Sequence, residues 1–224
     1  MGDLEVNKLI VESQNDKYFI ERLITKLNLN NLDFYEPLCN INDYICLDGM
    51  DNLKKRLQDE KLDDIDRLGI ILDVDKEGLS QRLSQINTIL KELNIDIQLD
   101  IINQFKKDEK LDLEIACYII NIDDEGELED ILKEIKTSDS TYADCLDNWK
   151  ECLIQNGKDI SEKDLLKFWI NNYIRFDTCS NDDKKQISKK CNLKVALEKD
   201  IWDFDHKVLD DLKVFLKLFG ADND

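Results

Sequence analysis

The chain has 224 residues and a formal charge of −19, from 50 acidic against 31 basic residues. A surface this acidic repels nucleic acid and anionic lipid unless its charge is reversed locally. Hydrophobic residues make up 42% of the chain, with seven Gly and one Pro, which excludes a disordered or fibrous protein and indicates a compact one.

Cysteine usage and the N-terminal sequence bear on the compartment. The seven cysteines form no CxxC pair, and a single histidine cannot complete a zinc site of the usual spacing. We therefore expect reduced, mostly structural thiols and a cytoplasmic protein. No basic region followed by an apolar stretch opens the sequence, and no segment approaches the length of a membrane span. No leader peptide and no membrane partner are expected.

Strand-like and helix-like segments alternate in the first 120 residues. KLIVE (8–12) is a short apolar run, and apolar side chains recur at helical spacing over 16–27. The alternation continues through predicted strands and helices at 43–47, 50–60, 68–72, 79–93 and 113–120. This order predicts an α/β fold with a mainly parallel four-stranded sheet flanked by helices.

After Asn121 the pattern is helical only. Predicted helices cover 126–135, 141–154, 161–174 and 206–219. We expect an α/β core at residues 1–135 and a helical C-terminal portion at residues 136–224 that packs on it, as a single compact domain overall.

Two features of the helical portion concern nucleic-acid binding. Trp149, Trp169 and Trp202 fall among helical apolar residues, which predicts core positions. Base stacking would need exposed aromatics interleaved with basic residues, and that pattern is absent around them. The segment KKQISKKCNLKVALEK (184–199) has six Lys and a single Glu. A solvated helix face is its usual explanation, but it is also the best candidate for a phosphate-facing surface.

Acidic side chains follow two of the predicted strands. Glu12 ends KLIVE, and Asp73 and Asp75 end LGIILDVD. Ligands of open parallel sheets bind beyond the carboxyl ends of the strands. If the two strands are neighbours, three carboxylates meet at one edge, where a divalent cation would relieve their repulsion. Asp16, one helical turn after Glu12, would lie over the same edge.

These residues lie in motifs that resemble those of a known superfamily. LIVESQNDKYFI resembles the first TOPRIM motif, an apolar strand that ends in Glu, and ILDVD resembles the second, the DxD strand end. TOPRIM domains are the metal-binding modules of topoisomerases, bacterial primases and OLD (overcoming lysogenization defect) nucleases. IINIDDEGELEDIL and DFDHKVLDDLKVFL resemble small stand-alone TOPRIM-like proteins catalogued as a domain of unknown function, over most of the chain.

The resemblance implies a TOPRIM/Rossmann-like fold and a set of ligands for Mg²⁺ or Mn²⁺. It makes Glu12 a metal ligand or general acid/base and makes Asp73 and Asp75 metal ligands. The spacing of Glu12 and Asp16 is similar to that of OLD nucleases, where both carboxylates serve the metal site. Glu129 matches an acidic position of the stand-alone proteins, with Glu127 as its rival.

Two departures from the family pattern stand out. Ser13 replaces the Gly that usually follows the first-motif Glu, which puts substrate geometry in doubt more than metal binding. Asn121 stands where the narrower family has Pro. Neither departure removes a ligand.

The leading expectation is a Mg²⁺- or Mn²⁺-dependent TOPRIM-type nuclease that hydrolyses phosphodiesters of DNA or RNA. The resemblance implies an effector of bacterial anti-phage defence that works beside a separate ATPase subunit, and a homo-oligomer is left open. The alternative is a catalytically weak or inactive metal-binding or scaffold protein of an ATPase complex. Ser13, the negative charge and the missing basic groove favour this alternative.

Other enzyme classes fit the sequence less well. ILDVDKEG also resembles the first motif of haloacid-dehalogenase-like phosphatases, but position 77 is Glu rather than Thr or Val. The strand-helix units also precede this motif instead of following it. A ligase or topoisomerase would need a nucleophilic Lys or Tyr motif, and none is found.

Overall fold

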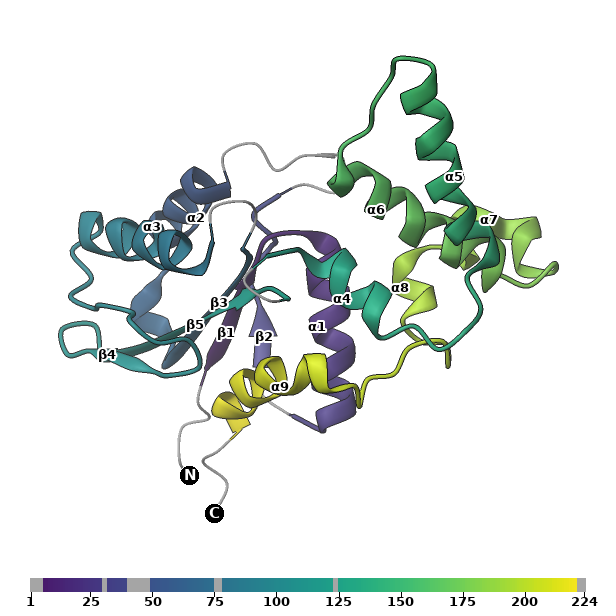
Figure 1. The fold of residues 1–224 in the computed structure, drawn as a ribbon. Helices are drawn as coiled ribbons and strands as arrows, with labels where there is room; N and C mark the ends of the chain where they lie inside the picture. Colours follow the sequence, from purple (N-terminus) through teal and green to yellow (C-terminus); the bar gives the residue numbers. More distant parts are fainter. Residues whose placement is uncertain (1–5, 30–31, 40–48, 75–77, 123–124, 221–224) are drawn as a thin grey trace. The chain divides into compact units, whose positions relative to one another are not determined.

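The computed structural model describes residues 6–29, 32–39, 49–74, 78–122 and 125–220. The chain divides into two compact units. The first unit combines Met1–Leu128 with Leu209–Asp224, and the second unit is Glu129–Val208. Helix α9 (Asp210–Lys217), yellow in Figure 1, therefore belongs to the same unit as the N-terminal strands.

In the described part of the first unit, five strands form one sheet in the order β2-β1-β3-β5-β4. They are β1 (Asn7–Val11), β2 (Leu32–Phe34), β3 (Arg67–Asp73), β4 (Lys106–Asp108) and β5 (Leu113–Ile120). β1, β2, β3 and β5 run parallel, and β4 pairs antiparallel with β5. The predicted α/β fold with a mainly parallel sheet and a helical C-terminal part is confirmed, but the count of four strands is wrong.

The strand count is wrong because the edges of the sheet carry no hydrophobic pattern. β2 and β4 are three residues long, with the sequences LDF and KKD, so they show neither an apolar run nor an alternation. The predicted strand at 43–47 lies outside the described residues. The predictions at 8–12, 68–72 and 113–120 are confirmed as β1, β3 and β5.

Helices cover both faces of the sheet (Figure 1). α2 (Gly49–Asp59) and α3 (Leu79–Glu92) pack on one face, where Leu53 and Ile86 join the apolar core. α1 (Gln14–Leu27) and α9 lie on the other face. Burial on both faces explains why β3 and β5 are almost continuously apolar.

Gly69 of β3 lies where α9 and the residues after it pack on the sheet. A Cβ atom at this position would collide with Leu9 of β1 and would stand 2.7 Å from Cζ of Phe219. The Phe219 ring also meets Phe105 edge-on, with ring centroids 5.0 Å apart. Only a glycine allows this close approach of the C-terminal segment to the sheet.

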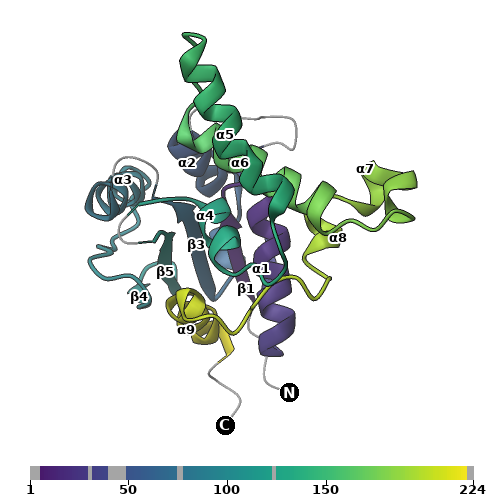
Figure 2. The same cartoon turned by 45° about the vertical axis from the view of Figure 1, so that its right-hand side comes forward.

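The second unit contains α5 (Thr141–Gln155) and α6 (Glu162–Asn172), which lie side by side in Figures 1 and 2. It also contains α4 (Leu128–Glu134) from Glu129 onward and two short helices, α7 (Ile187–Lys190) and α8 (Leu193–Ala196). A single π-helical turn at Tyr173–Asp177 follows α6.

The core of the second unit is built around aromatic rings. Tyr173 stacks on Trp169 and meets Trp202 edge-on, with both pairs of ring centroids 5.3 Å apart. The prediction of core positions is confirmed for Trp169 and Trp202, which are buried. It is wrong for Trp149, which is 40% exposed.

The cysteines differ from the expectation of reduced thiols. Cys179 and Cys191 form a disulfide within the second unit, with Cα atoms 5.8 Å apart, and Cys39 is also disulfide-bonded. The prediction is therefore wrong for these residues, because cysteine spacing alone does not reveal which thiols meet in the fold. Cys117 is a buried free thiol, and Cys145 and Cys152 are exposed free thiols.

Within the described ranges, no helix combines the length and the apolar character that a membrane span needs.

Candidate functional site

Glu12 and Asp73 meet at the carboxyl edge of the sheet, the edge at which the parallel strands end. β1 and β3 are neighbours, with Val11 paired to Ile71, so Glu12 follows β1 beside the end of β3. Oε2 of Glu12 accepts a hydrogen bond from the backbone N–H of Asp73, with an N···O distance of 3.4 Å. The condition that the two strands are neighbours is therefore met.

Backbone hydrogen bonds fix both residues in this position. The carbonyl of Glu12 accepts from the N–H of Cys39 at 2.9 Å, and Val74, after β3, donates to the carbonyl of Ile120 at 3.0 Å. Asp73 is buried and Glu12 is half-buried. Asp73 thus ends β3, and Glu12 lies in the bend directly after β1.

Arg82 brings a positive charge to this edge and is a residue that the sequence prediction missed. It lies in the first turn of α3 and is 6% exposed. Its Nε donates to the backbone carbonyl of Asp73 at 2.9 Å, and its Nη1 donates to Gln85 at 3.3 Å. The guanidinium thus binds the main chain at the end of β3.

A signal for Arg82 was present in the sequence. Apolar residues at positions 79, 83, 86 and 90 mark the buried side of the predicted helix, and position 82 lies on that side because it is three residues from 79 and four from 86. Arginine is almost never fully buried unless it is paired. An arginine on this side of the helix therefore indicates a partner near the strand ends.

Asp16 is buried in the first turn of α1, where it caps the helix with Ser13. Oγ of Ser13 accepts from the N–H of Asp16 at 3.2 Å, and Oδ2 of Asp16 accepts from the N–H of Ser13 at 2.7 Å. This capping box satisfies backbone donors at the start of the helix. Ser13 therefore has a structural role, and so does the Asp16 carboxylate.

The remaining predicted ligands stand in different parts of the chain. Asp75 lies outside the described residues. Glu129 is half-buried in the first turn of α4 and belongs to the second unit. Glu127 is buried and belongs to the unit that carries Glu12 and Asp73.

Carboxylates are the side chains at this edge that could hold a divalent ion. Among the described residues, which do not include Asp75, no three His, Cys, Asp or Glu side chains are grouped so that they could hold a metal. Mg²⁺, however, is usually held by only one or two carboxylates, with water and substrate phosphates as its other ligands. Glu12 and Asp73 fit that requirement as a pair.

A surface hollow of about 470 Å³ in the first unit lies elsewhere. Leu57, Lys61, Leu62 and Leu93 are among its lining residues. They come from the ends of α2 and α3 and from the segment before β3, which lie toward the amino ends of the strands. The hollow therefore does not coincide with the site at the carboxyl edge.

Comparison with known proteins gives a family without an assigned activity. Residues 6–220 match the family described as "Protein of unknown function (DUF3226)". The chain belongs to the DUF3226 family. The match covers Glu12, Asp73 and Arg82, and it includes the whole second unit. No curated protein and no solved structure matches the chain. The chemistry of this DUF3226 protein therefore has to be argued from its residues.

Proposed function

We propose that this DUF3226 protein is a Mg²⁺- or Mn²⁺-dependent nuclease of TOPRIM type that hydrolyses phosphodiesters of DNA or RNA. The observation that carries the proposal is the hydrogen bond between Oε2 of Glu12 and the N–H of Asp73. It brings two acidic residues from neighbouring parallel strands together at the edge where such sheets bind ligands. The resemblance of both strand ends to TOPRIM motifs supplies the reaction class.

In this proposal Asp73, Asp75 and Glu12 hold the metal, and Glu12 also acts as general acid/base. A bound Mg²⁺ or Mn²⁺ would supply positive charge for the scissile phosphate and lower the pKa of a coordinated water. The N–H of Asp73 donates to Oε2 of Glu12 at 3.4 Å and so orients the carboxylate. In this role Glu12 accepts the proton of the attacking water and later returns it to the leaving oxygen.

Arg82 is assigned a positioning role. Its guanidinium holds the carbonyl of Asp73 and so fixes the end of β3. It also keeps a permanent positive charge at an edge that an anionic phosphate must approach. This charge matters because the first unit has 33 acidic against 17 basic residues.

The TOPRIM resemblance extends the proposal to the cellular setting. We propose an effector of bacterial anti-phage defence, with a separate ATPase subunit as its partner. The ATPase belongs in the test as an added component, because the isolated chain and the complex can differ in activity.

The experiment is a cleavage assay on tRNA, single-stranded DNA and duplex DNA, with Mg²⁺ or Mn²⁺ and with EDTA. Asp73→Asn and Glu12→Gln are expected to slow metal-dependent cleavage by about 100-fold or more, because each removes a charge needed in the transition state. Asp112→Asn is the control, since Asp112 pairs with Lys107 at 2.6 Å and its side chain is 85% exposed. Equal rates in all three variants would contradict the assigned site.

The capping box favours a second candidate, a catalytically weak or inactive metal-binding or scaffold protein of an ATPase complex. Ser13 replaces a glycine of the TOPRIM pattern, and Asp16 uses a carboxylate oxygen to cap α1. Calorimetry with Mn²⁺ separates the candidates. Binding that Asp73→Asn abolishes, without cleavage of any substrate even when the ATPase is supplied, would establish the scaffold.

A further inference from the structure

Four aromatic side chains are exposed along the helical pair α5 and α6 and the π-helical turn that follows. Tyr142 is 63% exposed, Phe168 48%, Phe176 41% and Trp149 40%. They form two contacts: the ring centroids of Tyr142 and Phe176 are 5.9 Å apart, and those of Trp149 and Phe168 are 6.0 Å apart. We call these four residues the aromatic ladder.

The helix geometry places both contacts on one side of the helical pair. Tyr142 and Trp149 are seven residues apart on α5, so they share one helix face at an axial separation of about 10.5 Å. On the second helix, the π-helical turn Tyr173–Asp177 carries Phe176 back toward the start of α5. Asp177 completes the connection, because its carboxylate accepts from the N–H groups of Tyr142 at 2.8 Å and Ala143 at 3.0 Å.

The exposure of the ladder is not a result of loose packing. Trp169, next to Phe168 in the chain, is 2% exposed, stacks on Tyr173 and donates from Nε1 to Asp144 at 3.0 Å. One side of α6 is therefore firmly anchored while the other presents rings to solvent. A contiguous exposed patch of this kind marks an interaction surface.

Cations stand over one end of the ladder. Nζ of Lys184 is 5.8 Å from the centroid of Phe176 and also donates to the Phe176 carbonyl at 3.5 Å. Cζ of Arg175 is 5.6 Å from the same centroid. Asp177 is the acid next to Phe176 in the chain. Its carboxylate accepts hydrogen bonds from N-terminal amides of α5, which neutralise part of its charge.

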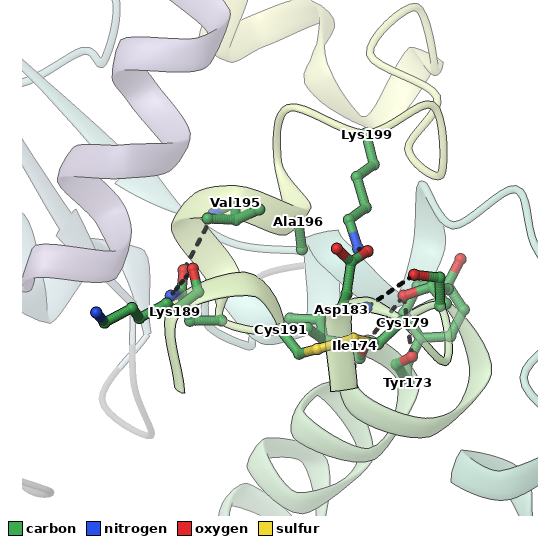
Figure 3. A network of polar contacts seen from close by, with 12 residues as sticks. Tyr173, Ile174, Cys179, Asp183, Lys189, Cys191, Val195, Ala196 and Lys199 are labelled. Carbon is green, nitrogen blue, oxygen red and sulfur yellow. Dashed lines mark hydrogen bonds and ion pairs between the residues drawn. A yellow bond between two sulfur atoms is a disulfide. The ribbon is translucent and has the colours of Figure 1, made fainter. Parts of the chain in front are cut away.

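Lys184 begins the basic segment, residues 184–199, which has six Lys and one Glu. Figure 3 shows the disulfide between Cys179 and Cys191. It closes a loop in which four of these lysines lie. Asp183, in the same loop, pairs with Lys199 at 3.8 Å, as Figure 3 shows. The disulfide thus ties a lysine-rich loop to the end of the ladder.

We infer that the aromatic ladder and the basic segment bind single-stranded nucleic acid. Bases would stack on the four rings, and phosphates would contact Lys184, Arg175 and the lysines that follow. Charge complementarity favours this occupant over a protein. Arg175 and Lys184 lie over the ring of Phe176, and Lys184 is the first residue of a lysine-rich segment. That single-stranded nucleic acid is the substrate rests on the proposed nuclease function. Binding of single-stranded nucleic acid can be tested without cleavage.

The test is fluorescence anisotropy of a labelled oligothymidine of about 20 nucleotides in EDTA and about 50 mM salt, with the full chain. Trp149→Ala and Phe168→Ala are each expected to weaken binding by about tenfold, the loss of one base-stacking contact. Lys184→Gln is expected to reduce the slope of log affinity against log salt by about 0.7. A duplex of the same length should bind more weakly because its bases are not free to stack.

The matched control is Ile154→Ala, since Ile154 is a 55% exposed aliphatic residue of the same helix that is not part of the ladder. Unchanged thermal unfolding of every variant shows that the fold is intact. Wild-type affinity in the ladder variants would overturn the inference. An absence of oligonucleotide binding would also overturn it. The same holds if light scattering shows that the only effect of the ladder variants is to dissociate a protein oligomer. Binding without cleavage would refute the nuclease and leave this inference standing.

Discussion

The carboxyl edge of the first unit and the aromatic ladder of the second unit differ in charge, burial and shape. The first unit has 33 acidic against 17 basic residues, and its site is a pair of acids fixed at buried strand ends. The second unit is nearly balanced, with 17 acidic against 14 basic residues, and its ladder is exposed. A net charge of −19 would exclude nucleic-acid binding only if it were spread evenly over the surface.

The two units also differ in what holds them together. The first unit has a sheet that is buried on both faces, with the apolar sides of amphipathic helices over each face. The second unit has a compact aromatic core, short helices and a disulfide. Changes that act on one unit alone should therefore have separable effects, and hydrogen exchange resolved by peptide can measure each unit in the intact chain.

The largest effect is expected from loss of the disulfide in the second unit. Cys191→Ser opens a loop whose ends are 12 residues apart in the chain, which should cost about 3 kcal/mol of stability by restoring freedom to the unfolded state. Hydrogen exchange should accelerate in the second unit and stay unchanged in β1 and β3. Cys145→Ser is the control, because Cys145 is an exposed free thiol.

Metal binding should produce the opposite pattern. At about 100 times its dissociation constant, Mn²⁺ is expected to stabilise the first unit by about 2.7 kcal/mol, because it binds only the folded site. Exchange should slow in β1 and β3 and not in α5 and α6. Asp73→Asn should remove the stabilisation, whereas Asp112→Asn should keep it. Slowing that is equal in both units in the presence of Mn²⁺ would show that the ion binds elsewhere.

Gly69 tests the packing of the first unit. Gly69→Ala adds a Cβ that collides with Leu9 and crowds the ring of Phe219, so we expect a loss of about 2 kcal/mol in unfolding free energy. Denaturant titration measures the loss. Adding Phe219→Leu should recover part of it by making room for the methyl group. Full stability of Gly69→Ala alone would mean that α9 shifts at little cost.

The sequence predicted elements whose own residues carry a strong pattern. β1, β3, β5 and helices α1 to α3 follow from apolar runs and helical periodicity. β2 and β4 owe their pairing to neighbouring strands, and sequences such as KKD contain no trace of that context. Trp149 was misplaced because helical spacing identifies an apolar face but not whether another element covers it.

The candidate site was predictable where a general rule connects sequence to position. Glu12 and Asp73 were found because parallel strands bring their carboxyl ends to one edge, and the structure pairs β1 with β3. The role of Asp16 could not be predicted, since an acid in the first turn of a helix can be a metal ligand or a cap. Its hydrogen bonds with Ser13 are seen only in the fold. The contact of Arg82 with Asp73 likewise depends on how α3 packs.

Acid should have the smallest effect, and one aspartate in each unit serves to test it. Burial alone would raise the pKa of Asp108 in β4, but N–H donors from Asp96, Leu111 and Lys110 outweigh it and hold the pKa below its usual value. In the second unit, a hydrogen bond from Ser140 holds down the pKa of Asp144, against the effect of burial and with help from Trp169.

Because both pKa values are lowered in the folded state, each carboxylate stabilises its unit at neutral pH. That stability is lost as the pH falls below about 4, toward the folded-state pKa. Asp108→Asn should cost about 1 kcal/mol at pH 7, because the amide cannot accept all three donors, and should flatten the acid dependence of the first unit only. Asp144→Asn should flatten the acid dependence of the second unit only, and by less, because Asp144 is exposed and its charge is screened by solvent. Either variant could instead flatten the pH dependence of hydrogen exchange in both units. That result would show that the two units unfold together and that neither is stabilised independently of the other.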